Sequence, residues 1–151
     1  MSSYILGYGS LLNLPPNKKS WPVKVHGLKR SLNVAGQQHL LFGVKDVPTA
    51  QCNGLLFKVN AAELDQLLLR EKLYTLKPLA KERIEFYNNK IKFQPKDKIY
   101  GFYPQAKYVL SKKELATKPI SKKYLNTCLE GAAAVTNPVF LADFLKMSHG
   151  L

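Results

Sequence analysis

The chain has 151 residues, the length of one ordinary globular domain with a buried core. Apolar residues make up 46% of it and charged residues 22%, a composition that excludes intrinsic disorder. No apolar stretch reaches the roughly 20 residues of a membrane-spanning helix, and the N-terminus has neither the basic start nor the apolar run of a signal peptide. We therefore expect a single domain over residues 1–151, cytoplasmic and without a membrane segment.

The charge is strongly positive. Lys and Arg total 23 against 10 acids, for a formal net charge of +13, and 20 of the 23 are Lys because only Arg30, Arg70 and Arg83 are Arg. Such a balance favours nucleic acid, anionic membrane surfaces or anionic small molecules as partners. Specific base recognition, however, depends on the arginine fork, and the lysines are scattered. The pattern favours a solvated lysine-rich surface, not a nucleic-acid interface, and it predicts no particular oligomeric state.

The first two thirds of the chain have the pattern of a β-sheet. A short apolar run ends in a glycine-rich turn at 7–10, and the prolines of 14–17 then exclude regular structure. Alternation of apolar and polar residues, together with aromatic enrichment, predicts the strands. They are Ser3–Gly7, Val23–Val34, Leu40–Val44, Gly54–Val59, Leu79–Tyr87 and Ile99–Tyr103, with the polar segment Asp46–Asn53, which contains Pro48, joining the third and fourth.

The clearest helix is predicted between the fourth and fifth strands. Asn60 is a good N-cap, and Glu63 stands three residues later, where the acid of a capping box belongs. Good helix formers then continue as far as Glu71. The pattern predicts a helix that begins after Asn60 and includes Glu71.

The last third of the chain is helical in pattern. Ser121 is placed to cap a helix from Lys122 to about Val135, and Asn137-Pro138 starts a second helix that runs through Met147. Strands that come first and helices that come last favour an α+β domain over a βαβ array.

The glycine-rich turn after the first strand does not fit a nucleotide-binding loop. The dinucleotide fingerprint requires a third glycine where Leu12 stands, and Pro15-Pro16 excludes a helix that starts at the turn. Two interpretations stay open. The segment is a plain tight turn, or its backbone N–H groups bind an anionic group or an oxyanion.

No metal site or histidine-based catalytic site is predicted. His26, His39 and His149 have no Cys or carboxylate at ligand spacing. Cys52 and Cys128 are far apart and are expected to be reduced and partly buried. Because the Gly-x-Ser-x-Gly motif of a serine nucleophile is also missing, the carboxylates become the candidates for chemistry.

Glu71 occupies the most unusual position among the carboxylates. On the predicted helix it continues the face of Leu64, Leu67 and Leu68 at spacings of three and four. A carboxylate that faces the core costs free energy, and burial raises its pKa toward the range of a general base. The alternative is that the helix ends before Glu71, whose side chain then turns to solvent. On the late helix, Tyr124 shares a face with apolar residues and is interpreted as core.

Taken together, these features resemble the γ-glutamylcyclotransferase-like family. That family opens with a strand that leads into Tyr-Gly-Ser, present here at 8–10. A strand that begins with glycine, here 54–57, then precedes a helix that ends in an acid, here 64–72, and a tyrosine follows. The segment 124–132 is similar to the family's late helix. Arg-Glu-Lys with a nearby Tyr is similar to the glutathione-degrading members, although Lys72-Leu73 stands where the family often has glycine.

The resemblance implies a fold, an activity and a site. The fold is a small mixed β-barrel with packed helices. The activity is release of 5-oxoproline from a γ-glutamyl compound (glutathione, a γ-glutamyl dipeptide or a γ-glutamylamine) without a cofactor, and Glu71 is the general base. The implied substrate-binding residues are Tyr8, Gly9, Ser10, Leu11 and Tyr74.

Two alternatives to the active enzyme remain at this point. The chain is a non-catalytic binding module whose lysines hold nucleic acid or another acidic partner, although no basic strand interleaved with aromatics supports this. Or it is a degenerate member that binds a γ-glutamyl ligand without turning it over.

Overall fold

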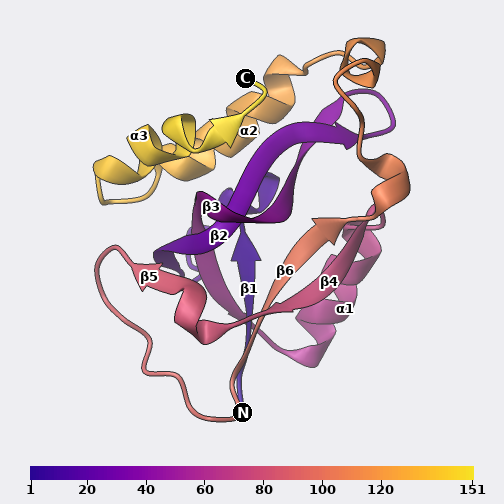
Figure 1. The fold of residues 1–151 in the computed structure, drawn as a ribbon. Helices are drawn as coiled ribbons and strands as arrows, with labels where there is room; N and C mark the ends of the chain where they lie inside the picture. Colours follow the sequence, from indigo (N-terminus) through magenta and orange to yellow (C-terminus); the bar gives the residue numbers. More distant parts are fainter.

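A computed structural model describes all 151 residues, and its elements are drawn in Figure 1. The strands are β1 (Ser3–Gly7), β2 (Trp21–Ala35), β3 (Leu40–Val59), β4 (Tyr74–Leu79), β5 (Ile84–Phe86), β6 (Lys98–Pro104) and β7 (Ser148–His149), and the helices are α1 (Ala61–Arg70), α2 (Lys122–Ala133) and α3 (Val139–Lys146). The strands form one mixed sheet beside helices, so the predicted α+β class is confirmed.

The sheet is built around β1. The strand order is β4-β6-β1-β3-β2-β5, with β7 paired to β2, and β1 is parallel to β6 and antiparallel to β3. Ile5 and Leu6 are fully buried because both faces of this central strand are covered. The loop that follows β1 therefore begins at a firmly held position near the centre of the molecule (Figure 1).

A β-bulge at Gly27 reverses which residues of β2 point inward. Val23 and Val25 are buried before it, whereas Leu28 and Arg30 are buried after it. Gly27 has φ 78°, in the left-handed region that glycine adopts at little cost. Because the side-chain period of a strand is two, one extra residue moves every following side chain to the other face. The bulge thus places an arginine in the core.

The prediction of two strands joined by the polar segment Asp46–Asn53 is wrong, because β3 runs without a break from Leu40 to Val59. His26 pairs with Gln51 and Leu28 pairs with Asp46, so residues 47–50 of β3 lie opposite Gly27 alone. Pro48 stands in this unpaired part, where its missing N–H removes no ladder hydrogen bond.

The predicted strand Leu79–Tyr87 is also wrong. β4 ends at Leu79, a 3-10 helix spans Lys81–Arg83, and β5 covers only Ile84–Phe86. The chain has to turn between these strands, since β4 pairs with β6 at one end of the sheet order and β5 pairs with β2 at the other.

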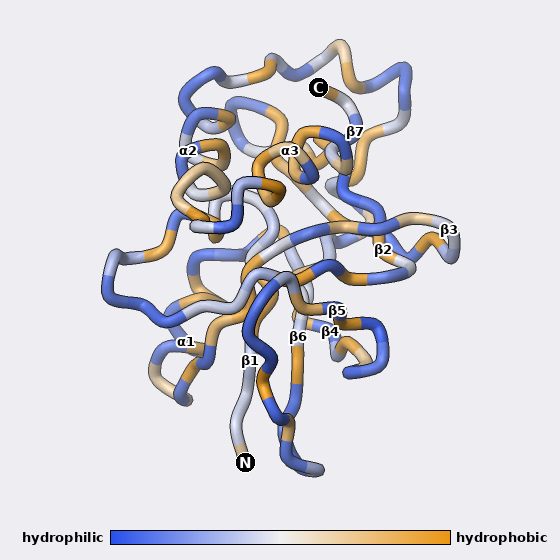
Figure 2. Tube along the Cα trace, turned by 90° about the vertical axis from the view of Figure 1, so that its left-hand side faces the viewer, coloured by the Kyte–Doolittle hydropathy of each residue, from blue (hydrophilic) through white to orange (hydrophobic).

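The first two helices follow their predicted caps, whereas Pro138, predicted as the first residue of the third helix, is the N-cap of α3. The Asn60 side chain accepts a hydrogen bond from the Glu63 N–H (2.8 Å), and the Glu63 carboxylate accepts one from the Asn60 N–H (3.0 Å), which completes the capping box of α1. Ser121 caps α2 by accepting a hydrogen bond from the Tyr124 N–H. Figures 1 and 2 show α2 and α3 side by side, with α1 on a separate side of the sheet. No helix of the chain combines the length and the apolar character needed to cross a membrane.

Candidate active site

One small cavity brings the predicted site residues together. Tyr8, Gly9, Ser10, Leu11, Glu71 and Tyr74 all line it, and Phe42, Phe102 and Tyr124 complete its wall. It lies where the end of β1 meets the end of α1, the start of β4, and the strands β3 and β6. Its volume is about 30 Å³, room for about two water molecules.

The loop after β1 presents its backbone, not its tyrosine side chain, as the available polar group. The buried Tyr8 hydroxyl donates a hydrogen bond to the Phe102 carbonyl oxygen (2.5 Å), which fixes the ring in the core. Among the backbone hydrogen bonds outside helices and strands, none has the N–H of Tyr8 or of Gly9 as its donor. Buried N–H groups nearly always have a partner, and these two have no backbone acceptor, so they are candidate donors to a ligand.

Glu71 is the C-cap of α1 instead of its last helical residue, because its φ and ψ are −99° and 54° and the helix ends at Arg70. The predicted leucine face is only partly correct. Leu64 and Leu67 are half-buried, whereas Leu68 is 44% exposed. The two half-buried leucines pack against a small apolar cluster made of Ile5, Leu11, Phe57, Val59 and Phe102. The Glu71 N–H still bonds to the Leu67 carbonyl oxygen, so Glu71 follows Leu64 and Leu67 at the end of the helix, and it lines the cavity.

The Glu71 carboxylate is shielded but has few partners. Its side chain is 15% exposed, and the nearest cation is Arg70, whose Nε lies 3.8 Å from Oε1. Burial raises the pKa of Glu71 above its ordinary value, and Arg70 offsets part of that rise. No hydrogen bond contributes to the shift of this pKa. A desolvated carboxylate without a hydrogen-bond donor is suited to take up and return a proton.

Arg70 also joins the end of α1 to the loop. Its Nη2 donates a hydrogen bond to the Ser10 hydroxyl oxygen at 3.3 Å, on the exposed side of the site. Ser10 and Glu71 are therefore both held by one guanidinium, although their sequence positions differ by more than 60 residues.

Two tyrosines hold the backbone of Phe42 from opposite elements. The Tyr74 hydroxyl donates to the Phe42 carbonyl oxygen (2.6 Å), and the Phe42 N–H donates to the Tyr124 hydroxyl oxygen (3.0 Å). Tyr124, predicted to be a core residue, thus lines the cavity, and its hydroxyl group also lies against the Cys128 thiol. Gly9 lies close to it, since a Cβ built on Gly9 would be 3.1 Å from that oxygen.

Three residues that line the cavity were not predicted as site residues: Phe42, Phe102 and Tyr124. Phe42 and Phe102 occupy strand positions whose apolar character predicts only burial. Tyr124 carried one usable signal, a hydroxyl group on an otherwise apolar helix face, and a half-buried tyrosine hydroxyl usually has a specific partner.

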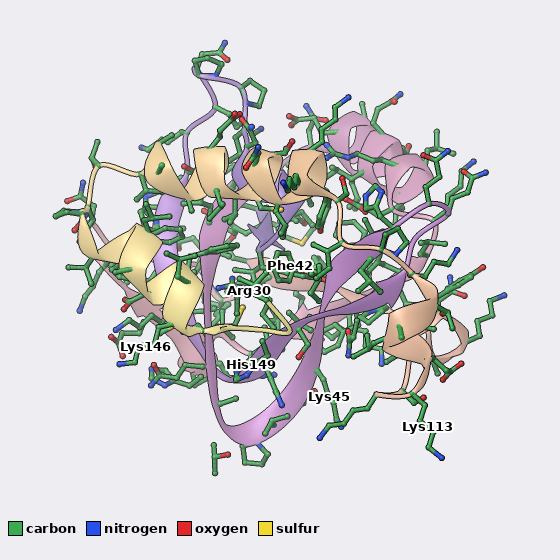
Figure 3. The ribbon with its side chains drawn as sticks, turned by 90° about the horizontal axis from the view of Figure 1, so that it is seen from above. Arg30, Phe42, Lys45, Lys113, Lys146 and His149 are labelled. Carbon is green, nitrogen blue, oxygen red and sulfur yellow. The ribbon has the colours of Figure 1, made fainter.

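The remaining polar candidates lie outside this cavity. Cys52 and Cys128 are free and buried, as predicted, and no group of His, Cys, Asp and Glu side chains has the arrangement of a metal site. In Figure 3, Arg30 and Phe42 lie near the centre, whereas Lys113 and Lys146 lie at the periphery.

Many lysines cover aromatic rings. Seven have the ammonium group within about 6 Å of a ring centroid: Lys18, Lys19, Lys24, Lys58, Lys77, Lys81 and Lys107. Part of the lysine excess therefore shields the edges of the apolar core from water while the charges remain hydrated.

Comparison with known proteins supports the fold. No protein-family model matches the sequence, and no curated protein matches it. A solved γ-glutamyl cyclotransferase superposes with a TM-score of 0.69 at 15% identity, over 99% of this chain and 90% of its own. A yeast γ-glutamyl cyclotransferase specific to glutathione gives 0.66 at 14% identity, over 97% and 95%.

YkqA from Bacillus subtilis gives a TM-score of 0.68 at 14% identity over 99% of this chain, which spans only 56% of the length of YkqA. Likenesses at such identities establish the fold. The chain has the fold of the γ-glutamyl cyclotransferases.

Proposed function

We propose that the protein is a γ-glutamyl cyclotransferase in which Glu71 is the general base. The observation that carries the proposal is the Glu71 carboxylate: it is 15% exposed, accepts no hydrogen bond that lowers its pKa, and shares one cavity with the loop Tyr8–Leu11. The fold that the chain shares with γ-glutamyl cyclotransferases supports this assignment.

The reaction uses a single proton carrier. Glu71 takes one proton from the uncharged α-amino group of the substrate as that nitrogen attacks the γ-carbonyl carbon of the same residue. The new C–N bond closes a five-membered ring, the original γ-amide bond breaks, and Glu71 returns the proton to the departing amine. The products are 5-oxoproline and that amine. Because attack is intramolecular, positioning supplies much of the acceleration and no cofactor takes part.

The loop and the tyrosines hold the substrate in this scheme. The N–H groups of Tyr8 and Gly9 donate to substrate oxygen atoms, and the Tyr124 hydroxyl supplies a polar group on the facing wall, where it already contacts the Phe42 N–H and the Cys128 thiol. Ser10 and Leu11 form the rest of the loop wall. Tyr74 acts by shape, since its hydroxyl is already bonded to Phe42.

The cavity size bears on the substrate class. A γ-glutamyl group needs more room than about 30 Å³, so it has to displace side chains at the exposed side, such as that of Arg70, which is 55% exposed. The leaving amine then lies outside the cavity. Glutathione, γ-glutamyl dipeptides and γ-glutamylamines all satisfy this arrangement, and the glutathione-specific yeast structure places glutathione first for testing.

The test is release of 5-oxoproline by the purified chain from glutathione, a γ-glutamyl dipeptide and a γ-glutamylamine between pH 6 and 9. We expect turnover of at least one of them. Release from none at any pH would overturn the proposal, and binding of a γ-glutamyl compound without turnover would identify a degenerate member of the fold.

A hollow on the sheet favours a second candidate, an anion-binding module. Lys29, Lys45 and Lys77 line a cavity of about 710 Å³, and none of them has a carboxylate within 4 Å. The one acid there, Asp46, is already held by Arg83 and Tyr103. This candidate predicts polyanion binding that falls steeply with salt and does not change in Glu71→Gln.

A further inference from the structure

Arg30 is fully buried and uses every nitrogen of its guanidinium. Nε donates to the Ser148 hydroxyl (2.8 Å), and Nη2 donates to the Asn53 side-chain oxygen (2.8 Å) and the Phe144 carbonyl (3.1 Å). Nη1 donates to the Asn53 carbonyl (2.6 Å) and the Tyr8 carbonyl (3.2 Å). The guanidinium also lies 4.1 Å from the ring centroid of Phe144. One side chain thus ties β3 and the end of α3 to the loop of the candidate active site.

The charge of Arg30 has no acidic partner. Of the five ion pairs in the structure none includes Arg30, and all its acceptors are neutral. A buried charge costs free energy that an apolar residue of similar size does not. Stability alone therefore does not explain why a cation occupies this position, from which it donates a hydrogen bond to the Tyr8 carbonyl oxygen.

The bond to Tyr8 sets the direction of the next N–H group. The Tyr8 carbonyl and the Gly9 N–H belong to one peptide unit, and the chain contains no cis peptide bond. In a planar trans peptide, C=O and N–H point in opposite directions. Since the carbonyl points toward Arg30, the Gly9 N–H points away from it. This is the same N–H that has no backbone acceptor, on a residue that lines the cavity.

We propose that Arg30 is a positioning residue that holds the Tyr8–Gly9 peptide so that the Gly9 N–H donates to the oxyanion formed on the substrate γ-carbonyl. The inference rests on the proposed cyclotransferase function. A hydrogen bond from a cation to the carbonyl end of a peptide also polarises its N–H end, which strengthens donation to the charge that develops in the transition state. Rotation of this peptide would remove the donor without moving Glu71.

The first test compares two variants of the same buried cluster. Arg30→Lys keeps the positive charge but loses the planar fork, and Asn53→Ala removes the Nη2 acceptor but leaves the bond from Nη1 to Tyr8. We expect kcat to fall about 100-fold in Arg30→Lys with KM changed less than about threefold, and to stay within about threefold of wild type in Asn53→Ala even though its Tm falls. Wild-type kcat in a folded Arg30→Lys, or parallel losses of kcat and Tm in both variants, would overturn the proposal.

The second test uses the wild-type chain and so does not depend on a variant that folds. Titration with 5-oxoproline is followed by the amide resonances of uniformly ¹⁵N-labelled protein. The Gly9 amide proton is expected to move downfield as it gains an acceptor. A Gly9 signal that stays fixed while those of other cavity residues move would overturn the role of this peptide. A wild-type chain that releases no 5-oxoproline from any γ-glutamyl compound would instead overturn the function on which the inference rests.

Discussion

The Arg70 guanidinium is the only cation within ion-pair distance of the Glu71 carboxylate, with 3.8 Å between Nε and Oε1. Arg70 is 55% exposed, so water weakens its attraction for the carboxylate. Burial, the larger effect, therefore leaves the pKa of Glu71 raised. The two residues together set the pH range in which Glu71 is a base.

The pH dependence of kcat/KM should reflect both Glu71 and Arg70. Since Glu71 acts as a base only when ionised, kcat/KM is expected to fall on the acidic side with an apparent pKa above 4.5. Because Arg70 lowers the pKa of Glu71, Arg70→Gln is expected to move this limb to higher pH. The measurement is kcat/KM from pH 4 to 9 for both proteins. A shift of the acidic limb to lower pH in Arg70→Gln would contradict this role of Arg70.

Removal of the Glu71 charge should stabilise the fold at neutral pH. A raised pKa means that the folded chain holds the proton more tightly than the unfolded chain, so the stabilisation is complete below the unfolded pKa and is lost as pH rises through the folded one. At pH 8 Glu71→Gln should therefore be more stable than wild type, by about 1 kcal/mol or roughly 2–4 °C in Tm. Near pH 4 the difference should disappear. Calorimetric unfolding at both pH values checks it, and a lower Tm for the variant at pH 8 would contradict it.

The two tyrosines on Phe42 should differ in their effects. Tyr74→Phe removes one donor to the Phe42 carbonyl, which should cost about 1 kcal/mol of stability and leave kcat/KM nearly unchanged. Tyr124→Phe leaves the Phe42 N–H without its acceptor, at about 1–3 kcal/mol, and takes a hydroxyl group out of the cavity wall. We expect only this second variant to lose kcat/KM, by at least about tenfold. Denaturant unfolding and steady-state kinetics separate the two, and equal kinetics would refute the role of Tyr124.

The bulge at Gly27 should tolerate little change. Gly27→Ala forces a side chain into the left-handed region, at a cost of about 1–2 kcal/mol. Asn enters this region more readily, so Gly27→Asn should recover part of the loss. The free energy of unfolding of the two variants tests this. Equal stability of Gly27→Ala and wild type would show that the bulge does not depend on glycine.

Local sequence rules predicted where α1 begins, through the capping box of Asn60 and Glu63. The loop Tyr8–Leu11 and Tyr74 were named by the resemblance, and they line one cavity with Glu71 because distant strands bring them together. The leucine face of α1 is only partly as predicted, because Leu64 and Leu67 pack inward ahead of Glu71 whereas Leu68 is exposed.

Features that depend on distant pairing were not predictable in the same way. The polar run 46–53 continues β3 because β2 supplies its partners on both sides of the bulge. Arg30 was counted only as part of the surface charge, since a strand pattern without the bulge leaves its direction undetermined. Arg30 is buried because the extra residue at Gly27 moves the side chains that follow it to the other face of β2. In the sequence this shows only as a change in which alternate positions are apolar before and after Gly27.

The role of Glu71 is most directly tested by 5-oxoproline release at saturating substrate, with Glu71→Gln compared with Glu130→Gln. Glu130 is exposed on α2, so the second variant makes the same chemical change outside the cavity. We expect Glu71→Gln to lose about 10²–10⁴-fold in kcat while Glu130→Gln keeps the wild-type rate. A Glu71→Gln protein that releases 5-oxoproline within a few-fold of wild type would show that the base is another group.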